Sequence, residues 1–392
     1  MQNELRSTNP LLIWGILLVA VNLRPALASV GPLVEDIRQT TGLSSSQLGL
    51  LTTLPLIAFG IISTLTPLCT RRFGIGGTLL GAMALLAIGA AVRSIAWLPA
   101  LYLGTLLVGI AIAFGNVLLP SLTKRNFASR SGFVTSLYSS MMGLGAALAA
   151  GISVPLANDL QLGWRGSLGV WSIAAVVAFV VWLPQVRRLV RSEPNRSFSK
   201  AMKHLGGSTL AWQVALFMGL QSLTFYVVLA WLPAILMSRG YDASHSGWML
   251  ALSQAMGILG SFLIPMFAGM RADQRSIVWL LTVVESIGLA GILLDQGGWI
   301  TLWVSLIGFV LGGSFGLALL FIVLRSSDTE SATELSGMAQ SIGYCVAATG
   351  PMLFGWLFDL TQDWTYSILF LFVVLLFKLG MGVGAGAARK LD

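Results

Sequence analysis

The first long apolar stretch of the chain, LLIWGILLVAVNLRPALASVGPL (residues 11–33), contains a single charged residue, Arg24. A helix needs roughly 20 apolar residues to cross the hydrocarbon core of a bilayer, so this stretch is long enough to span a membrane. Of the 392 residues, 56% are hydrophobic and 10% are charged, unlike a soluble globular domain. The sequence therefore predicts an all-α membrane protein.

Eleven further apolar runs of comparable length follow, with short polar segments between them. We therefore predict twelve transmembrane helices. Their expected ranges are 11–36, 47–69, 75–93, 97–121, 131–158, 164–186, 209–238, 245–270, 277–294, 299–324, 336–359 and 364–388.

Positive charge lies almost entirely on one side of these spans. With both termini in the cytoplasm, seventeen Lys and Arg residues fall in cytoplasmic segments and four on the opposite side. This asymmetry follows the positive-inside rule. We expect a multi-pass protein of a bacterial-type inner membrane with both termini cytoplasmic, and the net charge of +8 then requires no nucleic-acid partner.

The chain divides into two halves of six spans around a basic polar segment at 187–207. Glycine and proline positions recur between the halves: Gly49 and Pro67 match Gly247 and Pro265 at one constant offset. This pattern favours two parallel repeats, as in the major facilitator architecture. We predict an N-terminal six-helix bundle (1–186), a cytoplasmic linker (187–208) and a C-terminal six-helix bundle (209–392), related by pseudo-two-fold symmetry.

Three motifs carry a more specific resemblance: NLRPALASVGPL at 22–33, PSLTKRNF at 120–127 and AWLPA at 230–234. In their order and spacing, they resemble the cyanate and nitroimidazole transporter family (CynX/NimT) of the major facilitator superfamily. The superfamily also has a basic loop after spans two and eight, which implies a cytoplasmic latch between the bundles. The corresponding residues are Arg71, Arg72, Arg271, Asp273 and Arg275. Because the first loop, CTRRFG, contains no acid, we expect its latch to be weaker than is usual in the superfamily.

Arg24 lies about midway along the first span, where a permanent charge costs about 2.5 to 3.5 kcal/mol on insertion scales. A guanidinium keeps its proton, so it must face water, a carbonyl, an acid or an anionic ligand. Pro25 and Pro32 donate no backbone hydrogen bond, which loosens the helix around the charge. We interpret Arg24 as the centre of a substrate site. The alternative is an ion pair with a protein acid that ties two helices together.

Uncharged polar residues in the spans that line or flank the cavity of this architecture are further substrate-binding candidates. They are Asn116, Tyr138, Gln221, Trp231, Gln340 and Tyr344. Together they offer aromatic walls and a few hydrogen-bonding groups, as small-molecule sites do. Tyr226 is expected to point away from the face that carries Gln221 and Trp231. Each candidate has a structural alternative, because polar residues also join membrane helices and Trp and Tyr mark membrane interfaces.

Other charged residues near or within the spans have less defined roles. Glu285, near the middle of span nine, is a candidate for proton coupling, with a structural role as the alternative. Lys378 is nearer the cytoplasmic end of span twelve, where a long side chain can extend to the headgroups, and we interpret it as structural. At the outer face we expect a charge cluster that forms either a gate or solvated pairs of little energetic consequence. It consists of Glu35, Asp36, Arg38 and Arg93.

These features predict a secondary transporter that moves a small anionic or weakly acidic solute by alternating access. The resemblance implies a cyanate-like anion or a nitroimidazole-like heterocycle, and protons are a candidate coupling ion. Two alternatives are a multidrug efflux transporter and a membrane receptor that binds without transport. The sequence carries no catalytic, nucleotide-binding or metal-ligand motif, so we expect no enzyme activity, cofactor or metal. The expected partners are the solute and membrane lipid, and we expect a monomer.

Overall fold

The computed structural model describes residues 10–43, 45–189, 198–294 and 298–391. All regular structure in these ranges is helical. In chain order the elements are α1 (Pro10–Asn22), α2 (Pro25–Ala28), η2 (Gly31–Leu33), α3 (Val34–Thr41), α4 (Ser45–Val92), α5 (Leu98–Asn126), η3 (Ala128–Arg130), α6 (Ser131–Asn158), α7 (Gly163–Arg188), α8 (Phe198–Gly207), α9 (Thr209–Ser238), α10 (Ala243–Ala268), α11 (Arg275–Leu294), α12 (Ile300–Arg325), α13 (Thr329–Thr361) and α14 (Trp364–Gly386).

Eleven segments of the described chain are long and apolar enough to cross a membrane, and they account for the twelve predicted crossings. The difference comes from α4, whose 48 residues include Gly74 with φ 71° and ψ 168°. Glycine adopts this non-helical conformation readily because it lacks a Cβ. Gly74 therefore divides α4 into two legs, which correspond to the predicted spans 47–69 and 75–93.

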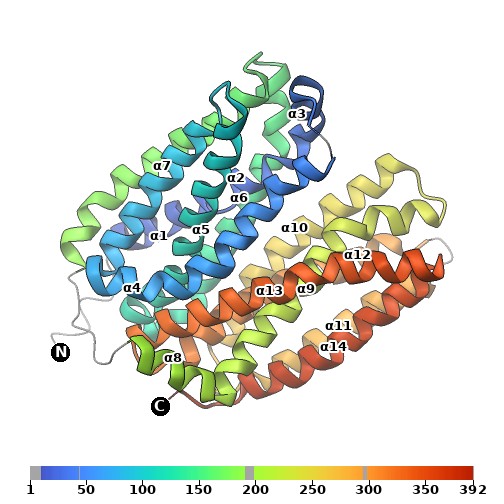
Figure 1. Ribbon diagram of the computed structural model, residues 1–392. Coiled ribbons are helices and arrows are strands. Elements are labelled where there is room, and N and C mark those ends of the chain that lie inside the picture. The colour runs from blue at the N-terminus through green and yellow to red at the C-terminus, as the bar shows by residue number, and fades with distance from the viewer. Residues whose placement is uncertain (1–9, 44, 190–197, 295–297, 392) are drawn as a thin grey trace.

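The helices form two bundles (Figure 1). Helices α1–α7 make up the first bundle and α9–α14 the second. The main contacts between the bundles are those of α4 and α5 with α13, and of α6 with α10. The short helix α8 buries Ala201 and Leu205 and packs against α9 and α13. The predicted fold class, an all-α protein of two six-helix bundles, is confirmed.

The two bundles lie close together at one end and diverge at the other (Figure 1). The close end carries α8, Arg275 and residues 385–391, and we call it the basic end. There Lys124 of α5 donates a hydrogen bond to the Val323 carbonyl of α12 at 3.1 Å. The structure is therefore closed at the basic end.

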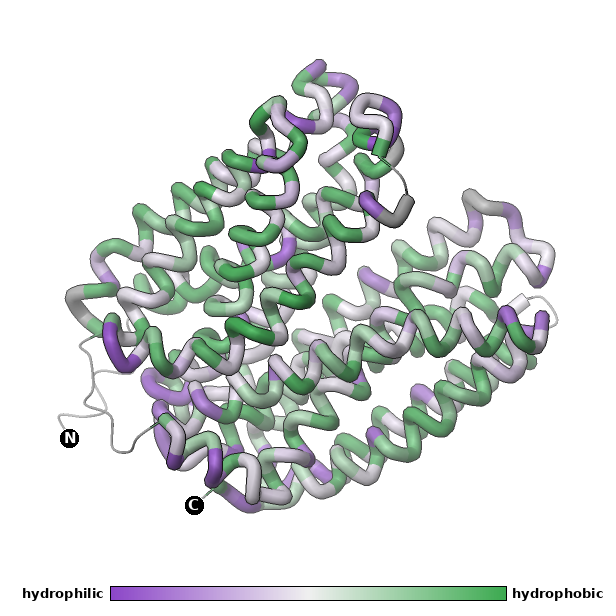
Figure 2. The backbone as a smooth tube through the Cα atoms, viewed as in Figure 1, coloured by the Kyte–Doolittle hydropathy of each residue, from purple (hydrophilic) through white to green (hydrophobic). Residues whose placement is uncertain are grey.

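Large hydrophobic side chains cover much of the outer surface. Trp14, Leu376 and Phe377 are each more than 60% exposed, at 64%, 68% and 62%. Figure 2 shows hydrophobic residues along the lengths of the helices and hydrophilic residues gathered mainly near their ends. Extended apolar surfaces of this kind are unfavourable in water, which agrees with a bilayer as the surrounding solvent.

Candidate functional site

The first predicted span is a broken helix, and Arg24 lies at the break. Helix α1 ends at Asn22, and Arg24 directly precedes Pro25, the first residue of α2. The broken helix packs closely on α6, because a Cβ at Gly145 would overlap the Val21 carbonyl oxygen. The loosening of the helix that the prolines predict is thus observed as a break between α1 and α2. The break is packed against α6 and places Arg24 at mid-span.

Arg93 holds the broken helix from inside the first bundle. Its side chain is fully buried, and its guanidinium donates to the Ala26 carbonyl, to Ser29 Oγ at 3.5 Å and to the Leu168 carbonyl at 3.4 Å. The sequence analysis expected Arg93 in a charge cluster at the outer face, and this was wrong. The reason is that backbone acceptors around the helix break draw the guanidinium inward.

Arg24 reaches across to the second bundle. Its guanidinium carbon lies 5.2 Å from the centre of the Phe315 ring on α12, within the range of a cation–π contact. The Arg24 charge also acts electrostatically on Tyr226 of α9 and Tyr344 of α13. Asn116 Nδ2 of α5 donates to the Tyr344 hydroxyl at 3.2 Å. These five residues, Arg24, Asn116, Tyr226, Phe315 and Tyr344, are called the central cluster.

No carboxylate pairs with Arg24 in the part of the chain that the structure describes. Arg24 and Phe315 are half-buried, whereas Asn116 and Tyr344 are buried. The Asn116 Oδ1 atom is buried and has no hydrogen-bond partner among the described residues. Because leaving a buried polar group unpaired costs free energy, the central cluster has unused capacity both for an anion and for a hydrogen-bond donor.

The other predicted binding residues lie in different surroundings. Gln340 is buried one turn before Tyr344, and its Oε1 has no partner in the described ranges. Tyr138 is fully buried in the hydrophobic core. Gln221 donates within its own helix, to the Met218 carbonyl at 3.0 Å and to Ser222 Oγ at 2.7 Å.

Trp231 belongs to an aromatic group inside the second bundle. Its Nε1 donates to the Pro351 carbonyl at 3.0 Å, and its ring centre lies 5.6 Å from that of Trp364. Its observed contacts are therefore those of a helix-packing residue.

The sequence analysis missed two members of the central cluster. Tyr226 was expected to point away from the face that carries Gln221 and Trp231, and it does lie near Arg24, apart from both. It was missed because it was not itself considered as a binding residue. Phe315 was not considered, although it is a bulky ring among small residues in GGSFG (312–316) of a cavity-lining span. That local pattern was the available signal.

Glu285 and Lys378 form a buried ion pair between α11 and α14. Their side chains are 1% and 2% exposed, respectively. The Lys378 side chain does not extend to the headgroups, because the lysine meets a carboxylate inside the bundle. The structure therefore places Glu285 with Lys378 and not with the central cluster.

Arg71 joins the two bundles at the basic end. Its Nη2 atom lies 2.9 Å from Glu330 and 3.0 Å from Glu334, both near the start of α13. The neighbouring Arg72 lies over the ring of Phe73, with 5.4 Å from its guanidinium carbon to the ring centre. The first loop lacks its own acid, as the sequence indicated, but the opposite bundle supplies two.

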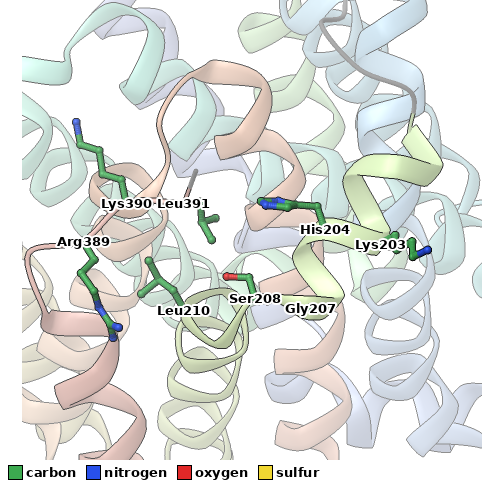
Figure 3. A pocket seen from close by; sticks show the side chains of 8 residues that line it. All are labelled: Lys203, His204, Gly207, Ser208, Leu210, Arg389, Lys390 and Leu391. Atoms are coloured by element: carbon green, nitrogen blue, oxygen red, sulfur yellow. The ribbon is translucent and has the colours of Figure 1, made fainter.

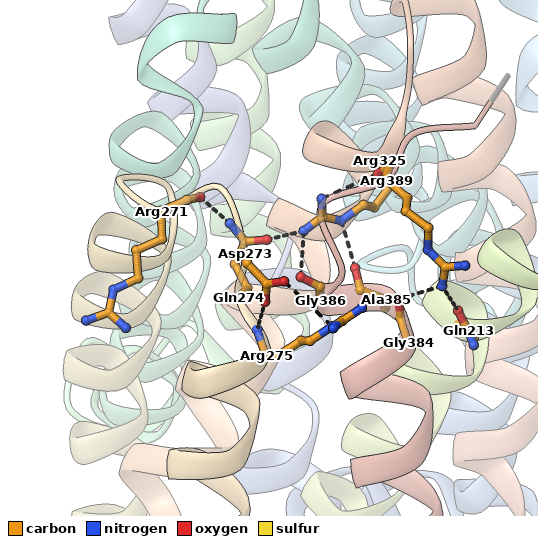
Figure 4. Close-up of polar contacts among 10 residues, drawn as sticks. All are labelled: Gln213, Arg271, Asp273, Gln274, Arg275, Arg325, Gly384, Ala385, Gly386 and Arg389. Carbon is orange, nitrogen blue, oxygen red and sulfur yellow. Dashed lines mark hydrogen bonds and ion pairs between the residues drawn. The ribbon is translucent and has the colours of Figure 1, made fainter.

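The loop after α10 makes its polar contacts within its own bundle (Figure 4). Arg271 donates to Ser276 Oγ at 2.9 Å, and Arg275 Nε lies 3.6 Å from Asp273. In the described residues, this loop thus forms no ion pair to the first bundle. The ion pairs that join the two bundles here therefore come from the first loop, through Arg71.

Arg325, at the end of α12, joins this loop to the end of the chain (Figure 4). It donates to the Ala385 carbonyl at 2.7 Å and to the side chain of Gln274. The Gln274 backbone N–H donates to the Gly386 carbonyl at 2.9 Å, and the Leu391 N–H donates to the Arg325 carbonyl at 2.7 Å. This network fixes residues 385–391 on the second bundle.

Comparisons of the sequence and of the structure with known proteins all point to the same superfamily. A sequence model of the Major Facilitator Superfamily matches residues 16–351. The chain is 42% identical over 363 residues to a 2-nitroimidazole transporter of Escherichia coli (strain K12), covering 91% of each chain. It is 30% identical over 359 residues to the cyanate transport protein CynX of Escherichia coli (strain K12), covering 90% of this chain and 92% of that one. A solved structure of the proton:xylose symporter XylE has a similar fold, with a TM-score of 0.74, 16% identity and 98% coverage of both chains.

Proposed function

Because the chain belongs to the Major Facilitator Superfamily and, within it, to the cyanate and nitroimidazole transporter family, we propose that it moves a small anionic or weakly acidic solute across the inner membrane. The proposed solutes are a cyanate-like anion or a nitroimidazole-like heterocycle, the classes named for two relatives. The moving units are the bundles 1–186 and 209–392, joined by the linker 187–208. With the basic end in the cytoplasm, the closed basic end corresponds to an outward-facing state.

The main support for this proposal is the position of the Arg24 guanidinium. It is a fixed positive charge at mid-span without a carboxylate partner in the described ranges, and it faces an aromatic ring of the other bundle at 5.2 Å. A small anion fits this environment because its charge complements the guanidinium, and the positive edge of the Phe315 ring suits an anionic group or the ring of a heterocycle. Since Arg24 and Phe315 belong to different bundles, separation of the bundles would take the solute's two contacts apart and so release it.

Flux into proteoliposomes tests the proposal. Wild-type protein, R24K and R24A are supplied with cyanate, 2-nitroimidazole and a neutral sugar, with and without a pH gradient. We expect R24A to lose about 10- to 100-fold in transport, the value of a charge-assisted hydrogen bond, and R24K to keep part of it. R239Q is the matched control, because Arg239 lies at the end of α9 and donates to the Leu293 carbonyl. Wild-type flux in both R24A and R24K would contradict the proposal.

The same liposomes distinguish the two alternatives. A multidrug efflux transporter would move several unrelated lipophilic cations, whereas a central arginine repels cations. A receptor would bind the solute with measurable affinity and show no flux. Saturable flux of anions with exclusion of lipophilic cations is the outcome that our proposal requires.

Proton coupling through Glu285 is a separate proposal, and its support is a carboxylate at membrane depth. Its pairing with Lys378 means that a proton could exchange at Glu285 only when the ion pair opens. The double variant with Glu285→Leu and Lys378→Met removes both charges together. If this variant still concentrates its solute in response to a pH gradient, coupling through Glu285 is excluded. Loss of gradient-driven accumulation with retained downhill flux would support it.

A further inference from the structure

A pocket of about 510 Å³ opens at the basic end, and no residue of the central cluster lines it (Figure 3). It lies between α8 and the end of the chain. Its lining residues are Lys203, His204, Gly207, Ser208, Leu210, Arg389, Lys390 and Leu391. Figure 3 shows His204 on one side, Arg389 and Lys390 on the other, and Leu391, Leu210 and Ser208 between them.

The pocket is lined by cationic groups without an acid among its lining residues. Lys203, Arg389 and Lys390 carry permanent positive charge at neutral pH. Part of Arg389 is already engaged, because it donates to Gln213 Oε1 and to the Gly384 carbonyl, both at 3.3 Å. The three charges and His204 are exposed at the rim, whereas Leu210 and Leu391 are buried at the floor.

Two further features make the pocket more attractive to an anion. Ser208 caps the N-terminus of the 30-residue helix α9, so the positive end of that helix dipole lies at the pocket. In addition, Lys390 repels Lys124, and Arg389 repels Arg325. An anion in the pocket would reduce both repulsions. The positive-inside rule explains why cations are on this side, and the pocket adds a concavity that four basic side chains line.

We propose that this pocket binds the phosphate group of an anionic ligand, either a free phosphate compound or the headgroup of an anionic lipid. Phosphate carries multiple acceptor oxygens and negative charge, which match lysine and arginine donors. The volume is within the range of small-ligand sites, about 300 to 1,000 Å³. The bound phosphate bridges α8 and residues 389–391.

A phosphate bound in this pocket would lie near the contact that closes the basic end. Lys124, which lies within the electrostatic reach of Lys390, donates across the bundles to the Val323 carbonyl and to the Ser326 carbonyl. The lining residue Leu391 donates to the Arg325 carbonyl, and Ser326, the next residue, accepts from Lys124, so an anion that orders residues 389–391 supports this contact. Phosphate binding therefore stabilises the closed arrangement of the two bundles.

Thermal unfolding of the purified full chain tests this inference. In one arm, the protein is in detergent and inorganic phosphate is added at constant ionic strength, with chloride as the reference. The other compares nanodiscs of phosphatidylcholine with nanodiscs that also contain phosphatidylglycerol. The test variant is K203Q with K390Q, the charge-conserving variant is K203R with K390R, and the matched control is K200Q, which removes an exposed lysine of the same helix outside the pocket.

We expect one or both ligands to raise the unfolding temperature of the wild type, of K200Q and of the Arg double variant. In the Gln double variant, the apparent Kd should rise about tenfold or more, as for loss of charge-assisted hydrogen bonds. A response to phosphate identifies a soluble ligand, and a response to phosphatidylglycerol alone identifies the lipid. The inference is overturned if neither ligand stabilises the wild type, or if K200Q and the Gln double variant respond alike.

Discussion

The two bundles treat charge at membrane depth in opposite ways. In the second bundle, Glu285 and Lys378 pair with each other and are almost fully buried. In the first bundle, Arg24 lies half-buried at a helix break and faces Phe315 across the bundle interface. A buried charge needs a partner, and of these three charges only the two of the pair have an oppositely charged partner among the described residues. From this contrast we propose that Arg24, unlike the paired charges, is available to a ligand.

The largest expected effect concerns the Glu285–Lys378 pair. K378M leaves a buried carboxylate without its partner, which should lower the free energy of unfolding by about 3 to 5 kcal/mol. The double variant with Glu285→Leu and Lys378→Met should recover most of this loss, because two apolar side chains replace both charges. Thermal unfolding in detergent measures both. An unfolding temperature of K378M equal to that of wild type would show that the pair is not needed for packing.

The next effect concerns Arg93, a buried arginine that binds carbonyls instead of an acid. R93M removes donors from the Ala26 carbonyl and Ser29, so we expect a loss of about 1.5 to 3 kcal/mol in stability. Because Arg93 holds the segment next to Arg24, solute affinity should fall as well, and R93K should restore part of both. Unfolding and equilibrium binding are measured on the same samples. Lower stability with unchanged affinity would mean that Arg93 does not position Arg24.

A smaller effect is expected at the basic end, where Arg71 pairs across the bundles and Arg275 pairs within one. R71Q should shift the equilibrium toward opening of this end by roughly 1 kcal/mol, or about fivefold. R275Q, the matched control, should not. The readout is thiol labelling of Ser121→Cys, a buried position bonded to Thr333 of the other bundle, in protein without its native cysteines. Equal labelling of the two arginine variants would refute this distinction between the loops.

The last effect, similar in size to that of R71Q, concerns the Tyr344 hydroxyl in the central cluster. Y344F removes the acceptor of the Asn116 hydrogen bond, a neutral interaction of about 0.5 to 1.5 kcal/mol. Solute affinity should fall about 2- to 10-fold. Y102F is the control, since Tyr102 donates to the Gln47 carbonyl at an exposed position. If both variants bind equally well, Tyr344 is not part of the site.

The helical architecture was accessible from sequence because hydrophobic length sets the crossing segments. Even the two legs of α4 were separated correctly, since basic residues and Gly74 interrupt the apolar pattern there. The break at Arg24 followed from the flanking prolines, which have no N–H to donate. These features depend on residues that are near one another in the chain.

Pairings between distant segments were not accessible in the same way. Lys378 and Glu285 are 93 residues apart, and a uniformly apolar helix does not reveal which face it turns to its neighbour. The acceptors for Arg93 become visible only once the broken helix and α7 are placed around its side chain. Sequence reasoning thus identified Arg24, Asn116 and Tyr344 but not the contacts that bring them together.

Equilibrium binding of the anionic solute to purified R24Q tests the central claim most directly. The account predicts that R24Q binds at least about tenfold more weakly than wild type, with an unfolding temperature that is unchanged or higher because an unpaired charge has been removed. Wild-type affinity in R24Q, or a destabilisation as large as that of K378M, would contradict it.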